Sequence, residues 1–150
     1  MLKTVLAAVC AAVALAAGPA AAQGASPTLA KIKAAKAINV AYSPDSAPFS
    51  SVTGSAAPQG YAIELCQRVI AQIARAVGEP ELKVNWIAAP VAERVQMVAG
   101  GRAELDCANT TQTQTRLASV DFSNLIFIDG GGLLVKAGAP INRIADLAGK

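Results

Sequence analysis

The sequence contains no histidine, and only 15% of its residues are charged. The missing histidines exclude Ser-His-Asp triads, histidine proton shuttles and the usual histidine-ligated zinc sites. The net charge of +3 is too small, and the basic residues are too scattered, to indicate a nucleic-acid-binding protein. The hydrophobic fraction of 53% excludes a disordered, self-repelling chain. A length of 150 residues is enough for one domain with a packed core.

Cysteine is also scarce, with Cys10, Cys66 and Cys107 as the complete set. No two of them form a C-x-x-C pair, so the sequence shows no thiolate metal site and no dithiol redox motif. Together with the lack of histidine, this pattern predicts a protein without a bound metal or cofactor.

The N-terminus has the pattern of a secretory signal peptide. Lys3 gives a positive start, residues 4–18 form an apolar run, and the small residues 20–22 fit the cleavage rule. The run is shorter than a comfortable membrane span, although a short transmembrane anchor is the alternative. Cys10 lies inside the run without the small residue that lipidation needs before it. We therefore expect cleavage after Ala22 and export to a compartment that permits disulfides.

Helical and strand patterns alternate along the rest of the chain. The clearest helix, over residues 61–80, has one apolar face at three- and four-residue spacing, formed by Ile63, Cys66, Ile70, Ile73 and Val77. The other helices are expected at residues 26–37 (with Thr28 as its cap), 90–101 and 141–149, and the strands at residues 38–43, 82–88, 103–108 and 125–138. This order predicts parallel strands joined by right-handed crossovers. The expected fold class is α/β, with a central, mostly parallel sheet flanked by helices.

An unusually polar stretch, residues 109–119, follows the strand expected at residues 103–108. It carries one Asn, four Thr, two Gln and one Ser, with a single arginine, Arg116. Ligands of open α/β sheets bind beyond the carboxyl ends of the strands, so the first residues of this stretch would line that crevice. Thr113 or Thr115 would open a short helix whose free N–H groups face the same crevice.

Arg116 adds a planar guanidinium that matches the two oxygens of a carboxylate. Combined with the hydroxyl and amide donors around it, this arginine predicts a carboxylate-binding site. The alternative is a solvated loop that carries one surface charge.

Four segments together resemble the periplasmic amino-acid-binding proteins of ABC importers, which form solute-binding protein family 3: "INVAYSPDSAPFS", "GYAIELCQRV", "AELDCANTTQTQTRLASVDFS" and "LLVKAGAPINRIADLAGK". The similarity covers residues 28–150, and the motifs are specific in combination rather than one by one. The resemblance implies a clamshell of two α/β lobes that closes over one amino acid. It also implies a periplasmic location, a monomer, and a membrane permease of an ABC importer as the partner.

The resemblance also implies roles for individual residues. Arg116 would pair with the α-carboxylate of the ligand, helped by the hydroxyl of Thr111, and Asn109 stands where a backbone or side-chain contact is usual. Ser46 takes the place of an aromatic shelf, and Arg94 would reach a side-chain carboxylate. These two features are similar to the glutamate/aspartate-binding branch.

Two points stay open in this interpretation. Ser43 stands where that branch has a second cationic residue, so another polar amino acid is the alternative ligand. Arg94 could instead be a solvent-facing helix charge paired to a neighbour.

Cys66 and Cys107 are the two cysteines of the expected mature chain. Cys66 lies on the inner face of the long helix, and Cys107 ends a strand that should pack beneath it. We expect a disulfide that closes a loop of about 41 residues and adds roughly 4 kcal/mol on the chain-entropy model. Two buried thiols are the alternative.

The expected domain division is a signal peptide at residues 1–22, the first lobe at 23–136, and a hinge with the start of a second lobe at 137–150. The family's second lobe supplies the Asp that binds the ligand's ammonium group, and the expectation is a chain truncated after its first lobe. A periplasmic dehydratase-type enzyme on the same fold and the sensor domain of a receptor are the alternative functions.

Overall fold

The computed structural model describes residues 26–54 and 56–149. The predicted signal peptide, residues 1–22, lies outside the described residues and stays a prediction. In the part of the chain that is described, no helix has the length and apolar character needed to span a bilayer.

The centre of the fold is a three-stranded parallel sheet in the order β4-β1-β5. β1 (Ala37–Tyr42) pairs along its whole length with β4 (Lys83–Ala88), and its second half pairs with the short β5 (Leu105–Cys107). The predicted alternation of strands and helices and the predicted α/β fold class are therefore confirmed. A small antiparallel pair, β2 (Asp45–Ser46) and β3 (Ser50–Ser51), lies in the segment expected to be loop.

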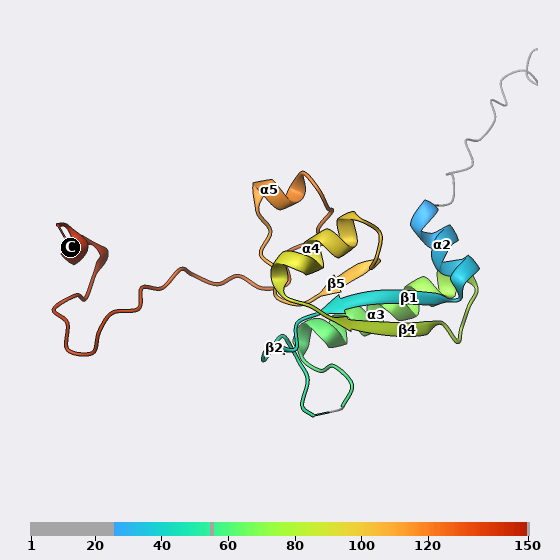
Figure 1. Cartoon of the computed structure of the whole chain (residues 1–150), viewed down its shortest axis with the longest axis horizontal. Coiled ribbons are helices and arrows are strands. Elements are labelled where there is room, and N and C mark those ends of the chain that lie inside the picture. Colours follow the sequence, from blue (N-terminus) through green and yellow to red (C-terminus); the bar gives the residue numbers. More distant parts are fainter. Residues whose placement is uncertain (1–25, 55, 150) are drawn as a thin grey trace, which may run out of the picture.

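Helices cover both faces of this sheet (Figure 1). α2 (Pro27–Ala35) and α3 (Tyr61–Val77) pack on one face, and α4 (Val91–Ala99) packs on the other. The apolar core on the α2 and α3 side consists of Ile32, Ile38, Val40, Tyr42, Ile63, Ile70, Val77 and Cys107. The smaller core under α4 consists of Ala41, Ala89, Met97 and Ala103. Since successive strand residues point to opposite faces, β1 contributes to both cores and is the most deeply buried strand.

The N-cap residue of the long helix α3 is Gly60, which allows the backbone of Pro48 and Phe49 to approach closely. Gly60 has φ +126°, and a Cβ atom there would lie 2.6 Å from the carbonyl oxygen of Phe49. Because that space is free, the amides of Tyr61 and Ala62 donate to the carbonyls of Pro48 and Phe49, at 3.0 and 2.9 Å. These bonds join the loop after β1 to the first turn of α3, and the predicted apolar face of α3 is confirmed.

The start of α2 differs from its prediction. Ser26 is the N-cap residue and Pro27 opens the helix, so the choice of Thr28 as the cap is wrong. Pro27 suits the first helical position because its ring fixes φ and its missing N–H would have no partner there.

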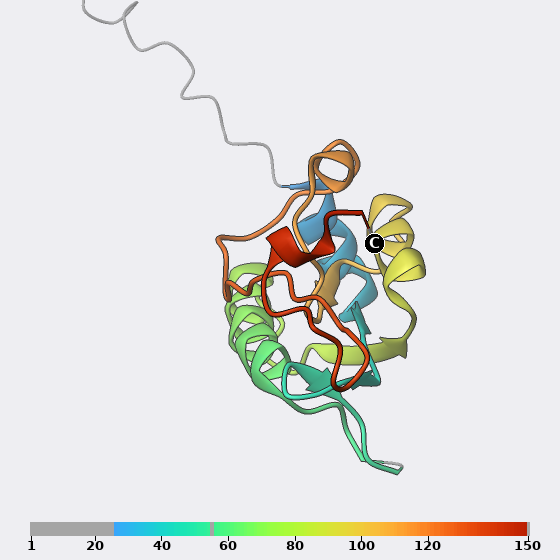
Figure 2. The ribbon, with the colours of Figure 1, turned by 90° about the vertical axis from the view of Figure 1, so that its left-hand side faces the viewer.

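The segment after residue 123 also differs from its prediction. The strand expected at residues 125–138 does not form; this segment leaves the packed lobe as an extended chain (Figure 1). In the end-on view of Figure 2 it lies in front of the lobe. Near the start of this segment, Tyr61 Oη donates to the carbonyl of Ile126 at 3.1 Å. The rings of Phe127 and Phe49 pack edge to face there, with their centroids 4.9 Å apart. Many large apolar side chains are exposed farther along: Ile128, Leu133, Leu134 and Ile144.

The helix expected at residues 141–149 is reduced to a single 3-10 turn, η1 (Ile144–Leu147). Its one polar feature is Asp146, whose carboxylate accepts hydrogen bonds from the backbone amides of Asn142 and Arg143 and from the Arg143 side chain. Those donors stabilise the charged form and lower the pKa of Asp146, with the Asn142 amide as the largest contributor.

Candidate functional site

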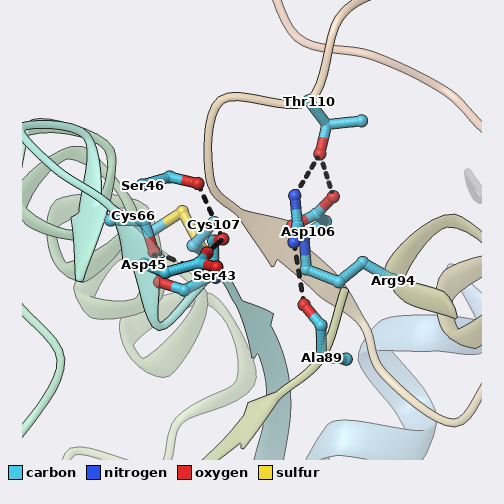
Figure 3. Close-up of polar contacts among 10 residues, drawn as sticks. Ser43, Asp45, Ser46, Cys66, Ala89, Arg94, Asp106, Cys107 and Thr110 are labelled. Atoms are coloured by element: carbon cyan, nitrogen blue, oxygen red, sulfur yellow. Dashed lines mark hydrogen bonds and ion pairs between the residues drawn. A yellow bond between two sulfur atoms is a disulfide. The ribbon is translucent and has the colours of Figure 1, made fainter. Parts of the chain in front are cut away.

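The carboxyl ends of the three parallel strands meet at one edge of the sheet, because all three run in the same direction. Ser46 lies in the segment that follows β1, and Arg94 lies on α4. The segment that follows β5 carries the other predicted ligand-binding residues: Asn109, Thr111 and Arg116. Figure 3 shows side chains from these loops on the two sides of the strand ends. The polar groups form three separate hydrogen-bonded sets.

The first set is an ion-paired cluster of Arg94, Asp106 and Thr110. Arg94 Nε donates to Asp106 Oδ1 at 2.9 Å, and Arg94 Nη2 donates to Thr110 Oγ1 at 3.1 Å. Thr110 Oγ1 in turn donates to Asp106 Oδ2 at 2.6 Å, and Arg94 Nη1 donates to the carbonyl of Ala89 at 2.8 Å. Each of these groups points toward the others in Figure 3. The cluster joins α4 to Ala89 after β4, to Asp106 within β5 and to Thr110 in the loop after β5.

The Arg94 side chain is only 2% exposed. The alternative of a solvent-facing helix charge paired to a neighbour is therefore wrong about solvent exposure, whereas its pairing is present, with Asp106 as the neighbour. Burial of a guanidinium is costly unless a carboxylate and further acceptors compensate it, and Asp106 with Ala89 supplies that compensation. A contact between Arg94 and a ligand stays a prediction.

The second set of polar groups follows β1. Ser43 Oγ donates to Asp45 Oδ1 at 2.9 Å and lies 2.8 Å from Ser46 Oγ. The amide and the carbonyl of Ser43 both bond to Ser50 Oγ, at 3.0 and 2.8 Å, so β3 closes this turn. Ser46, predicted to contact the ligand, is half-buried here.

Asp45 is a member of this set that the sequence analysis did not identify. It is an exposed carboxylate at the end of a buried strand. The polar run "SPDS" that directly follows β1 was the available signal.

The third set is the polar stretch itself. Thr113 is the N-cap of α5 (Gln114–Leu117), and its hydroxyl accepts from the amide of Arg116 at 3.3 Å. Of the two threonines expected to open this helix, Thr113 does so. Arg116 Nη1 donates to the carbonyl of Thr111 at 2.7 Å, so the side chain folds back over its own loop. Thr111 and the neighbouring Asn109 are exposed, and the structure brings both into one loop-helix unit with Arg116.

A disulfide between Cys66 and Cys107 ties α3 to the end of β5, with an S–S distance of 2.07 Å. The predicted pairing is confirmed, and the alternative of two buried thiols is wrong. The bridge lies next to the ion-paired cluster, because Cys107 directly follows Asp106 (Figure 3). The strand end that carries the polar stretch is therefore fixed both covalently and by the buried ion pair.

Two surface depressions lie away from these groups. One of about 280 Å³ is next to the Lys31–Glu104 ion pair at the amino ends of the strands, and one of about 260 Å³ lies between α3 and Trp86 of β4. Neither is lined by a predicted site residue. The candidate site is therefore assigned from the position of its residues after the strands, and not from either surface depression.

Comparison with known proteins identifies the family to which the chain belongs. The family described as "Bacterial extracellular solute-binding proteins, family 3" has a model that matches residues 38–146. The L-glutamate/L-aspartate-binding protein of Pseudomonas aeruginosa is 36% identical over 124 residues, which cover 82% of this chain and 41% of that protein. The glutamate/aspartate import solute-binding protein of Escherichia coli is 31% identical over 143 residues, covering 93% of this chain and 47% of that protein.

A solved structure gives the same result for the fold. The solute receptor for L-cysteine of Neisseria gonorrhoeae matches with a TM-score of 0.55 at 31% identity, over 64% of this chain and 37% of that one. The chain thus spans less than half the length of each of these three proteins. The resemblance inferred from the sequence motifs is confirmed, and the chain belongs to the family 3 bacterial extracellular solute-binding proteins.

Proposed function

We propose that this chain binds one polar amino acid, with glutamate and aspartate as the first candidates, in the periplasm. The bound amino acid would pass to the membrane permease of an ABC importer, and the chain would act as a monomer. The names of the relatives in Pseudomonas aeruginosa and Escherichia coli support the choice of ligand.

The observation that carries this proposal is the position of the Arg116 guanidinium. Arg116 belongs to the polar stretch that follows the carboxyl end of β5, and the carbonyl of Thr111 orients its guanidinium through one of the five N–H donors. No other hydrogen bond from this guanidinium is found within residues 26–54 and 56–149. The remaining donors can therefore form the paired hydrogen bonds that a ligand α-carboxylate accepts.

The remaining contacts to the ligand belong to the same proposal. Thr111 would add its hydroxyl to the α-carboxylate, and Asn109 would contribute a further polar contact. Ser46 and Arg94 would face the ligand's side chain from the ends of the neighbouring strands.

The domain division is likewise proposed. The sheet and its flanking helices all fall between Pro27 and Leu117, which supports a first lobe at residues 23–136. Residues 137–150 would then form a hinge and the start of a second lobe.

The proposal is for binding without catalysis, and the name of the Escherichia coli relative as an import solute-binding protein supports it. Incubation of the chain with a cyclohexadienyl carboxylate should return the compound unchanged. Formation of an aromatic product would instead favour the dehydratase alternative.

The test of the site is titration calorimetry of the full chain with the twenty amino acids, followed by the Arg116→Ala variant. Loss of a pair of charge-assisted hydrogen bonds, worth about 1.5–3 kcal/mol each, should weaken binding by roughly a hundredfold to ten-thousandfold. Arg102→Ala is the matched control, since Arg102 is exposed in the turn after α4 and the same charge is removed. Unchanged affinity in Arg116→Ala would remove Arg116 from the site.

A further inference from the structure

The ion-paired cluster bears on ligand selectivity, because Asp106 already neutralises Arg94, the cation proposed to face the ligand's side chain. We infer that Asp106 sets the preference of the site for the charge of the ligand's side chain, by cancelling the charge of Arg94. The inference rests on the proposed function, since it concerns the same amino-acid site.

The geometry shows how complete this cancellation is. Both Asp106 oxygens have a partner inside the cluster: Oδ1 accepts from Arg94 and Oδ2 accepts from Thr110. The side chains of Arg94 and Asp106 are 2% and 12% exposed, so water screens their mutual attraction only weakly. A ligand carboxylate near the strand ends therefore experiences a neutral pair in place of a free cation.

The cluster is also connected directly to the proposed carboxylate site. Thr110 is bonded to both charged members and immediately precedes Thr111, whose carbonyl orients Arg116. Asp106 immediately precedes Cys107 of the disulfide, which limits how far the strand end can move. A change in the charge of Asp106 would thus act beside the proposed carboxylate site, at a strand end that the disulfide holds.

Two further charged groups belong to the segments that follow β1 and β5. Asp45 contributes a carboxylate beside Ser43, and Arg116 contributes a guanidinium that the ligand's α-carboxylate would neutralise. No uncompensated cation among these four groups is left for a second ligand carboxylate. We therefore expect the natural chain to prefer glutamate over glutamine only modestly.

The decisive variant is Asp106→Asn, which keeps the size of the side chain and removes its charge. The dissociation constants of the full chain for L-glutamate and L-glutamine are measured by titration calorimetry. The freed charge of Arg94 should raise the preference for glutamate over glutamine on the order of tenfold, as expected for two unit charges separated by several ångströms inside a protein. A merely structural role of Asp106 would weaken both ligands equally, and an unchanged preference would overturn the inference.

Glu93→Gln is the matched control, because it removes the same charge from an exposed residue that precedes Arg94 on α4. Solvent and salt screen that position, so the preference should change by less than about twofold.

A double variant, Arg94→Gln with Asp106→Asn, covers the case in which Asp106→Asn fails to fold because its arginine is left unpaired. The double variant removes both charges, so its preference should stay within about twofold of the natural chain. A large loss of the preference for glutamate would show that Arg94 acts on the ligand despite Asp106, and would overturn the inference. Failure of the natural chain to bind any amino acid would instead overturn the proposed function, and this inference with it.

Discussion

Two apolar segments of this chain have similar side chains and opposite structures. β1, with the sequence "AINVAY", is the buried centre of the sheet, whereas residues 125–135, "LIFIDGGGLLV", run as an exposed chain outside the lobe. Leu134 in the second segment is fully exposed, and Val40 in the first is fully buried. A run of apolar side chains therefore does not by itself produce a buried strand.

The difference lies in the neighbours that each segment has. β1 pairs with β4 on one side and β5 on the other, and helices cover both of its faces. Residues 128–135 have no pairing strand among the described residues. A strand is stabilised by cross-strand pairs and by burial, so the same residue types remain extended but unpaired when both are missing. The three glycines at residues 130–132 weaken any residual preference for a strand.

The largest expected effect tests whether the folded lobe, and not the extended segment, accounts for the stability of the chain. Replacing Cys66 and Cys107 by serine removes the bridge between α3 and β5, and should lower the free energy of unfolding by about 4 kcal/mol. Urea denaturation measures the loss, and the natural chain under reducing conditions is the control. Amide exchange in residues 128–135 should be fast with or without the bridge. An identical urea midpoint in the oxidised natural chain and the variant would contradict this account.

A smaller effect is expected where the loop after β1 meets α3. In Gly60→Ala, the added Cβ would lie 2.6 Å from the Phe49 carbonyl oxygen at a φ that alanine rarely adopts. The expected cost is about 2 kcal/mol or more of unfolding free energy, measured by thermal or urea denaturation.

Gly131→Ala is the matched control in the extended segment, because a Cβ there meets no atom within 4 Å. It should change the unfolding free energy by less than about 0.5 kcal/mol. Comparable losses in both variants would mean that the extended segment is packed in solution.

The smallest effect concerns the place where the two regions touch. Phe127→Ala removes the edge-to-face contact with Phe49 and should cost about 1 kcal/mol. Leu134→Ala removes a side chain of full exposure and should cost close to nothing. Denaturation midpoints measure both, and exchange of amides near Ile126 reports whether the attachment is loosened. Equal costs would indicate that the segment contacts the lobe evenly along its length.

The same contrast explains which parts of the fold were predictable from the sequence. Spacing, capping and alternation predict the apolar face of α3, a short helix opened by Thr113 or Thr115, and the parallel direction of the strands. These are local patterns, or rules of connection that hold in nearly all α/β folds. The prediction of a strand at residues 125–138 was wrong because a strand needs a partner strand to pair with. The sequence of one segment does not show whether such a partner exists.

The candidate site divides in a similar way. The polar stretch and Arg116 are contiguous in sequence, so their joint placement after β5 could be expected. The burial of Arg94 could not, because its carboxylate partner comes from another element and the pair is formed only by tertiary packing. The hydroxyl cluster around Ser43 and Asp45 depends in the same way on Ser50, which returns through the small β2–β3 pair.

The strand order has a consequence for the newly made chain. The central strand of the sheet is the first to be synthesised, and its partners begin much later, at Lys83 and Leu105. Until those residues have left the ribosome, β1 has no hydrogen-bonding neighbour, and closing such long loops is slow. The sheet of the nascent lobe therefore cannot form before the residues of β4 and β5 have been translated.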